Sequence, residues 1–217
     1  MESIGVPKDW CIVDVYGLDN DLLAIVPQPV LAVILLFPIT DNLEKLKKEQ
    51  EEQEEEGEKA QKNENDSIKD IIFVKQLVSN SCGAMAVIHS IANNLDRISL
   101  LDGPLKKFIE TVKGLSPVEA GEILQSSDIG EVHDDIAEEG QTEAPDPNVN
   151  VNFHYATFVE HNGALVELDG RKSSPIIHSS TSRETLLQDT VKVIRSFMER
   201  DPENIHFTMM ALVPAFS

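Results

Sequence analysis

The chain has 217 residues, 41% of them hydrophobic and 26% charged, which excludes a disordered or fibrous protein and fits one large domain or two small ones. Its 18 Lys and Arg against 38 Asp and Glu give a formal net charge of −20 at pH 7. A surface this acidic repels phosphate backbones and anionic lipids, and we therefore expect neither a nucleic-acid nor a membrane partner.

Two cysteines, Cys11 and Cys82, are too few for a disulfide framework or a zinc site. Because no secretory signal opens the chain, we expect a cytoplasmic protein, which can also be nuclear, with a free thiol at Cys82.

The first predicted element is a strand at residues 30–37. This segment, VLAVILLF, is rich in Leu and β-branched residues, shows no polar alternation and lies between two prolines. That pattern favours a strand buried on both faces, with a short buried helix as the alternative. Residues 42–67 carry almost no large apolar side chain after Leu46. They are predicted to be a charged insertion or loop that buries little.

The middle of the chain predicts a strand followed by helices. Residues 71–74 are typical of a strand, and residues 82–95 of a helix, because apolar side chains recur there every three or four positions. A second helix is predicted at 105–112. The sequence Ser116-Pro117-Val118-Glu119 then has the form of a capping box with proline at the first helical position.

The last third begins with an acidic stretch and continues with a hairpin. Residues 124–148 contain many acidic side chains and no Lys or Arg, and Gly and Pro interrupt any long helix, so we expect a long functional or disordered loop. Residues 152–168 alternate around Asn162-Gly163, which is typical of a two-residue β-turn. An amphipathic helix at 185–200 and a strand at 205–213 complete the predicted elements.

The segment around Cys82 has the features of a nucleophile site. Cys82 would lie in the first turn of its helix, where free N–H groups and the helix dipole favour a thiolate, and Ser79, Asn80 and Ser81 can all cap. Gln76 lies six residues earlier, and its amide is a suitable oxyanion donor. A lone cysteine beside a helix is more often a small buried apolar residue, and the segment taken alone favours that interpretation.

The hairpin offers a base for this thiol. If Asn162 and Gly163 form the turn, residue 156 pairs with 169, so His154 and Asp169 share a face as diagonal neighbours. A carboxylate there can orient the imidazole, giving a Cys–His–Asp arrangement. Asp169 can instead be a turn residue paired with Arg171. His178 is the alternative base.

Taken together, these segments resemble the ubiquitin carboxyl-terminal hydrolases, a family of papain-like cysteine peptidases, and most closely its L3-type members. The resemblance rests on runs that span nearly the whole chain: DVYGLD (14–19), PQPVLAVILLFPIT (27–40), KQLVSNSCG (75–83), IHSIANN (88–94), EGQTEAP (139–145), ELDGRK (167–172) and FMERDP (197–202). It implies a single α/β domain over 1–217, a papain-like α-β-α sandwich. Helices would flank a mainly antiparallel sheet in a knotted backbone, with residues 124–148 forming a crossover loop over the active site.

The resemblance also implies the chemistry. Cys82 would be the nucleophile, His154 the general base and acid, Asp169 its orienter and Gln76 the oxyanion donor, with no metal or cofactor. The implied function is a deubiquitinating thiol hydrolase that acts as a monomer on small adducts or short peptides at the C-terminal Gly of ubiquitin. We expect Asp14, Val151 and Phe153 to contact this substrate. Ser81 stands where Ala usually precedes the cysteine, a small change.

Two alternative functions remain at this point. Family members usually carry a WLPLEANP-like run and a helix before the Gly-Val that stands here at residues 5–6. A chain starting after that segment would be expected to have altered substrate affinity and stability. This favours, as one alternative, a ubiquitin-binding module with little turnover. The other alternative is a hydrolase of a closely related ubiquitin-like modifier.

Overall fold

A six-stranded antiparallel sheet forms the centre of the molecule. The computed structural model describes residues 1–40, 68–129, 153–200, 202 and 206–215. Within them the strand order is β1-β6-β2-β3-β4-β5, and every neighbouring pair is antiparallel. The strands are β1 (Trp10–Val15), β2 (Ala32–Pro38), β3 (Phe153–His161), β4 (Ala164–Leu168), β5 (Ile176–Ser180) and β6 (Thr208–Pro214).

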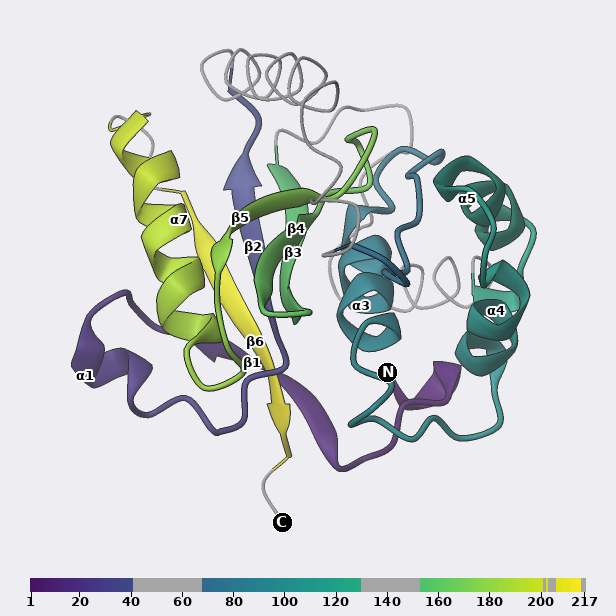
Figure 1. Cartoon of the computed structure of the whole chain (residues 1–217), viewed down its shortest axis with the longest axis horizontal. Helices are drawn as coiled ribbons and strands as arrows, with labels where there is room; N and C mark the ends of the chain where they lie inside the picture. Colours follow the sequence, from purple (N-terminus) through teal and green to yellow (C-terminus); the bar gives the residue numbers. More distant parts are fainter. Residues whose placement is uncertain (41–67, 130–152, 201, 203–205, 216–217) are drawn as a thin grey trace, which may run out of the picture.

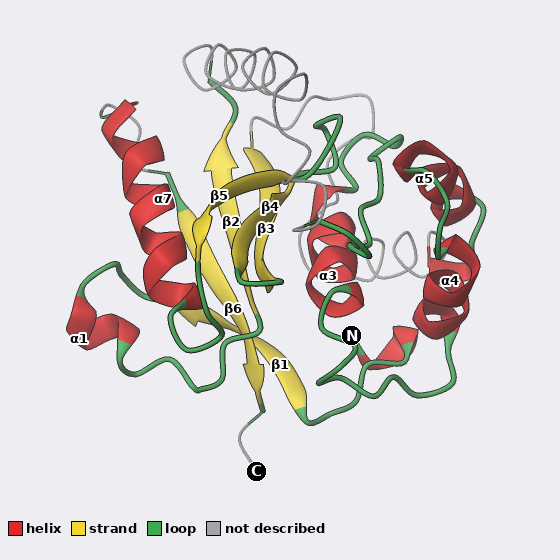
Figure 2. Ribbon diagram, viewed as in Figure 1, coloured by secondary structure: helices red, strands yellow, loops and turns green. Residues whose placement is uncertain are grey.

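Helices cover both faces of this sheet, so the protein is an α/β, α-β-α sandwich as predicted (Figure 1). On one face lie α3 (Cys82–Ala92), α4 (Pro104–Val112) and α5 (Pro117–Gln125), and on the other lie α1 (Asn20–Leu23) and α7 (Leu186–Arg200) (Figure 2). A short 3-10 turn, η1 (Glu2–Ile4), opens the chain. No described helix combines the length and the apolarity that a membrane crossing requires.

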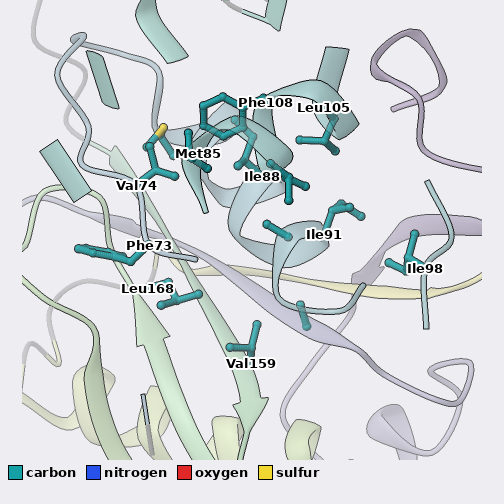
Figure 3. Packing of buried hydrophobic residues seen from close by; sticks show 14 of the residues in the cluster. Phe73, Val74, Met85, Ile88, Ile91, Ile98, Leu105, Phe108, Val159 and Leu168 are labelled. Carbon is teal, nitrogen blue, oxygen red and sulfur yellow. The ribbon is translucent and has the colours of Figure 1, made fainter. Parts of the chain in front are cut away.

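Two apolar cores fill the spaces between the layers. The core under α3 brings the predicted helical stripe against the sheet, with Met85, Ile88 and Ile91 all buried near Val159 and Leu168 (Figure 3). The core under α7 contains alternate residues of the same strands. Strand β2 lies in the middle of the sheet and contributes side chains to both cores, which confirms the prediction of a strand buried on both faces.

Several predicted helices and turns are confirmed. The helices at 105–112 and 185–200 correspond to α4 and α7, and the predicted last strand begins at Thr208. The capping box at the start of α5 is present, with the Ser116 hydroxyl accepting from the Glu119 N–H and the Glu119 carboxylate accepting from the Ser116 N–H. Strands β1 and β5 at the two edges, and helix α1, were not predicted.

Two expectations around α3 are wrong. Residues 71–74 form no strand, because side chains of α3 and of its C-cap residue take up their backbone groups. Asn93 accepts from the Ile72 N–H and donates to its carbonyl, and His89 Nε2 accepts from the Val74 N–H. Helix α3 also ends at Ala92, before the predicted residue 95, because the Asn93 and Asn94 amides donate to carbonyls in its last turns. The charged insertion 42–67 lies outside the described residues.

Candidate active site

The β3–β4 hairpin places His154 beside Asp169. Asn162 and Gly163 form the turn, both with positive φ, and His161 pairs with Ala164 and Thr157 with Leu168, which is the predicted register. Both site residues are buried, and His154 Nε2 lies 2.5 Å from Asp169 Oδ1. The sequence-based prediction that they share a face is therefore confirmed. Since Nε2 is bound to the carboxylate, Nδ1 is the ring nitrogen that remains for a second partner.

Cys82 is the first residue of α3, as its position after the Ser-Asn-Ser segment predicted. Ser81 occupies the N-cap position but does not cap with its side chain, because its hydroxyl donates to the Val78 carbonyl at 2.9 Å. The first N–H groups of a helix have no partner within the helix. They therefore supply positive potential beside the sulfur of Cys82, which favours an anion there.

The environment of Cys82 favours its thiolate form. Burial raises the pKa of the thiol, but a hydrogen bond with the His154 side chain and another with the Tyr155 backbone act in the opposite direction. The charge of His154 and the Gly83 backbone lower the pKa further, so that it lies below its usual value. A partly exposed cysteine with a lowered pKa is the arrangement expected of a nucleophile, and not of an inert buried thiol.

Gln76 lies on a segment that is fastened to both sides of the site. Its N–H donates to the Gly170 carbonyl at 2.8 Å, one residue beyond Asp169, and the N–H of Lys75 donates to the Pro117 carbonyl at 2.9 Å. The Gln76 amide Nε2 donates to the Val78 carbonyl at 3.0 Å. Its second N–H is left for another acceptor, as an oxyanion donor requires.

These side chains border one open cleft of about 390 Å³. Its lining residues come from the end of β2, from the segment before α3, from the start of β3 and from the turn after β4: Ile39, Gln76, Leu77, Val78, Ser79, Asn80, Cys82, Phe153, His154 and Arg171. The structure therefore brings the proposed nucleophile, base and oxyanion donor to one surface. Among the described residues, no cluster of three or more His, Cys, Asp or Glu side chains is arranged to hold a metal ion.

The predicted substrate-contacting residues are placed unequally. Phe153 lines the cleft, is partly exposed and contacts the ring of His206 edge to face. Asp14 is exposed on the edge strand β1, separated from β3 by β6 and β2, and does not line the cleft. Val151 and most of the expected crossover loop, from residue 130 onward, lie outside the described residues.

The alternatives for base and orienter are resolved by geometry. His178 Nε2 lies 2.7 Å from Glu167 Oε2, and its ring packs near Phe158 and Phe197. It does not line the cleft, so the structure does not support it as the base. The turn interaction of Asp169 exists alongside the His154 contact, because Asp169 Oδ1 also accepts from the Arg171 N–H at 2.9 Å.

Two residues at the site were not predicted. Lys75 donates through Nζ to the carbonyls of Arg171 at 2.8 Å and Lys172 at 2.7 Å, which ties the segment of Gln76 to the turn after Asp169. Arg171 lines the cleft and brings a positive charge into a strongly acidic protein. The position of Arg171 next to Asp169-Gly170 was a usable signal, whereas nothing in the local sequence indicated the partners of Lys75.

A thiol, an imidazole and a carboxylate in this order, on an α/β fold, define a cysteine-dependent hydrolase. Residues 1–199 match the family model described as ubiquitin carboxyl-terminal hydrolase, family 1, and the chain belongs to that family. A ubiquitin carboxyl-terminal hydrolase of Drosophila melanogaster is 39% identical over 99% of this chain and 92% of its own length. The human isozyme L1 is 37% identical with the same coverage.

Solved structures support the fold. The catalytic domain of Trichinella spiralis UCH37, bound to ubiquitin vinyl methyl ester, matches with a TM-score of 0.72, covering 96% of this chain and 86% of that one. Its sequence identity is 20%, so this likeness concerns the fold alone. The closer resemblance to L3-type members and the knotted backbone stay predictions.

Proposed function

We propose that this protein is a deubiquitinating thiol hydrolase that removes small adducts or short peptides from the C-terminal Gly of ubiquitin. The observation that carries the proposal is the hydrogen-bonded series from Cys82 to His154 to Asp169, with the thiol pKa lowered. Membership of the family supports the reaction class. Ubiquitin vinyl methyl ester is bound by the Trichinella spiralis protein of the same fold, which supports ubiquitin as the substrate.

The site residues would divide the reaction into two steps. The Cys82 thiolate attacks the carbonyl carbon of the terminal Gly, and the developing oxyanion is held by the Gln76 amide and the backbone N–H of Cys82. As the bond to the leaving group breaks, protonated His154 gives that group its proton. Water then attacks the thioester, neutral His154 takes up the water proton, and Cys82 leaves as the thiolate with free ubiquitin as the product. Asp169 keeps the imidazole oriented throughout.

The remaining properties of the proposal are expectations from composition, from charge and from the family resemblance. We expect the protein to act as a monomer in the cytoplasm, and also in the nucleus, without metal, cofactor, nucleic acid or membrane. The net charge of −20 suits a substrate whose tail is basic, because opposite charges increase the rate of encounter. The restriction to small adducts rests on loop 124–148, as the family resemblance implies.

A Cys82→Ala variant tests the proposal, with Cys11→Ala as the matched control because Cys11 is the other free cysteine of the chain. The substrate is a fluorogenic amide of the ubiquitin C-terminus. Cys82→Ala should lose turnover and adduct formation with ubiquitin vinyl methyl ester while still binding ubiquitin, and Cys11→Ala should keep all three. Turnover that survives in Cys82→Ala would refute the mechanism.

The same probe distinguishes the alternative functions. A wild-type protein that binds ubiquitin but forms no covalent adduct would be a binding module with little turnover. A protein that reacts faster with a ubiquitin-like modifier than with ubiquitin, in parallel assays, would have a different substrate and the same chemistry.

A further inference from the structure

A buried ion pair lies immediately beside the candidate active site. Lys172 Nζ is 2.9 Å from Glu167 Oε1, and both side chains are almost completely buried, with exposed fractions of 3% and 2%. The other carboxylate oxygen of Glu167 is 2.7 Å from His178 Nε2. Neither charged residue lines the cleft or takes part in the reaction described above.

The surroundings of Glu167 favour its charged form. Burial raises the pKa of this carboxyl, but the charge of Lys172 and the hydrogen bond with His178 outweigh it and bring the pKa to about 2. Asp169, a second carboxylate nearby, raises the pKa of Glu167. Lys172 is therefore a cation that offsets the buried charge of Glu167, and the neighbouring carboxylate of Asp169 contacts His154.

Stability alone is a weak reason for such a pair. Removing two charges from water is costly, and a buried ion pair is often no more stabilising than apolar residues of the same volume. Its position in the chain supplies a better reason. Glu167 lies in β4 and Asp169 is the first residue after this strand ends at Leu168, and Lys172 follows three residues after Asp169.

The ion pair closes the turn that carries Asp169. The N–H of Lys172 donates to the Asp169 carbonyl at 2.9 Å, which makes residues 169–172 a tight turn. The Lys172 side chain then reaches back to Glu167, while its carbonyl accepts from Lys75 Nζ at 2.7 Å. Lys172 is thus held through its N–H by Asp169, through its side chain by Glu167 and through its carbonyl by Lys75.

A β-bulge in β5 lies beside Glu167 and positions its second partner, His178. The partners of β4 step from Ser179, opposite Leu165, to Ile177, opposite Val166, so His178 is the extra residue. A bulge redirects a side chain, and here His178 contacts the Glu167 carboxylate. The Glu167 carboxylate is therefore held by His178 at one oxygen and by Lys172 at the other.

We infer that Lys172 is a positioning residue for the hydrolase: its ion pair with Glu167 closes the turn after β4 and holds Asp169 in line with His154. The inference rests on the proposed roles of Asp169 and His154 in the reaction. Lys172 does not line the cleft and takes no part in either step of the proposed reaction. It acts on the reaction only through the carboxylate of Asp169.

The test compares Lys172→Met with Asp169→Ala and with the double variant of both. Two experiments are needed: steady-state kinetics, which give kcat and KM for the fluorogenic ubiquitin amide, and the pH dependence of Cys82 alkylation by iodoacetamide. Lys172→Met should lower kcat by about 10- to 100-fold with little change in KM, because small displacements of a catalytic group have effects of this size. The pH at which Cys82 becomes reactive should rise, which loss of stability alone would not produce in a folded enzyme.

The Asp169→Ala background shows whether Lys172 acts through Asp169. In that background Lys172→Met should change neither kcat nor the alkylation profile further. An equal effect in both backgrounds, or a Lys172→Met variant with wild-type kcat, would overturn the inference. If Asp169→Ala lowers kcat while Lys172→Met does not, only the inference fails. If Asp169→Ala itself has no effect, the proposed reaction and the inference fail together.

Two further variants serve as controls, one for the loss of an ion pair elsewhere in the protein and one for unfolding. Arg183→Met removes a partly exposed ion pair with Asp96 and Glu160, away from the cleft, and should keep wild-type kcat and alkylation. Should Lys172→Met not fold, the variant Glu167→Gln/Lys172→Met removes both charges and leaves no unpaired carboxylate. It should fold with a reduced kcat, and full activity in this variant would also overturn the inference.

Discussion

The buried histidine of helix α3 predicts how the stability of the protein depends on pH. His89 is 1% exposed, stacks on Phe73 with ring centroids 5.4 Å apart, and accepts the Val74 N–H through Nε2 at 3.0 Å. A ring nitrogen that accepts a hydrogen bond must be unprotonated. Burial lowers the pKa of His89 from 6.5 to about 4, although Asp169 nearby acts in the opposite direction.

The direction and the size of the pH dependence of stability follow from this pKa. Between pH 6.5 and about 4 the unfolded chain binds a proton at His89 that the folded protein does not, so stability falls as the pH falls through this range. Each tenfold change in proton affinity is worth about 1.4 kcal/mol, so the full loss is about 3 kcal/mol, of which about 2 kcal/mol falls between pH 7 and 5. Glu167 contributes at lower pH: its carboxyl, whose pKa falls from 4.5 to about 2, stabilises the fold above pH 4.5 and loses this effect as the pH falls through 2.

Urea unfolding at pH 7 and pH 5, followed by circular dichroism, measures this contribution. A His89→Gln variant keeps an acceptor for the Val74 N–H but does not titrate. It should be less stable than wild type at pH 7, and its loss of stability between pH 7 and 5 should be smaller than that of wild type by about 2 kcal/mol. His161→Gln, which removes a partly exposed histidine from the hairpin, is the control and should behave like wild type. An unchanged pH dependence in His89→Gln would refute the reasoning.

Two further predictions concern helix α5. A Cβ added at Gly121 would lie 2.4 Å from the Lys75 carbonyl, so Gly121→Ala should lower the free energy of unfolding by about 1–3 kcal/mol and reduce kcat by displacing the segment of Gln76, although alanine favours a helix. Urea unfolding and kinetics measure both, and a more stable, fully active variant would contradict this. Ser116→Ala removes the cap of α5 and should cost about 1 kcal/mol, or about 2–4 °C in Tm. A calorimetric Tm equal to wild type would show that the capping box contributes nothing.

Most of the catalytic hairpin could be predicted from the sequence, because its geometry is local. A two-residue turn at Asn162-Gly163 fixes which residues pair, and alternation along each strand fixes which side chains share a face. These two facts were sufficient to place His154 beside Asp169. The position of Cys82 in the first turn of α3 was equally local, since the polar segment before it interrupts the apolar pattern.

Predictions that depended on distant partners were less successful. The segment 71–74 has the composition of a strand, but His89 of α3 and Asn93, the residue that follows this helix, bind its backbone. The sequence left His178 as an alternative base. In the structure, the bulge in β5 places its ring against the Glu167 carboxylate. In both cases local sequence showed what the residue could bind, and tertiary contacts chose the partner.

The sequence by itself therefore determined the two halves of the site, the helix start that carries the thiol and the hairpin that pairs imidazole with carboxylate. Only the tertiary structure decided that the halves meet at one cleft, that Lys75 joins the Gln76 segment to the turn after Asp169, and that Lys172 is buried against Glu167. The physical reason is the distance along the sequence over which each kind of interaction acts. Turn geometry and side-chain alternation act between neighbours in the chain, whereas the packing of α3 against β3 brings together residues that are far apart in sequence and whose contacts no local pattern encodes.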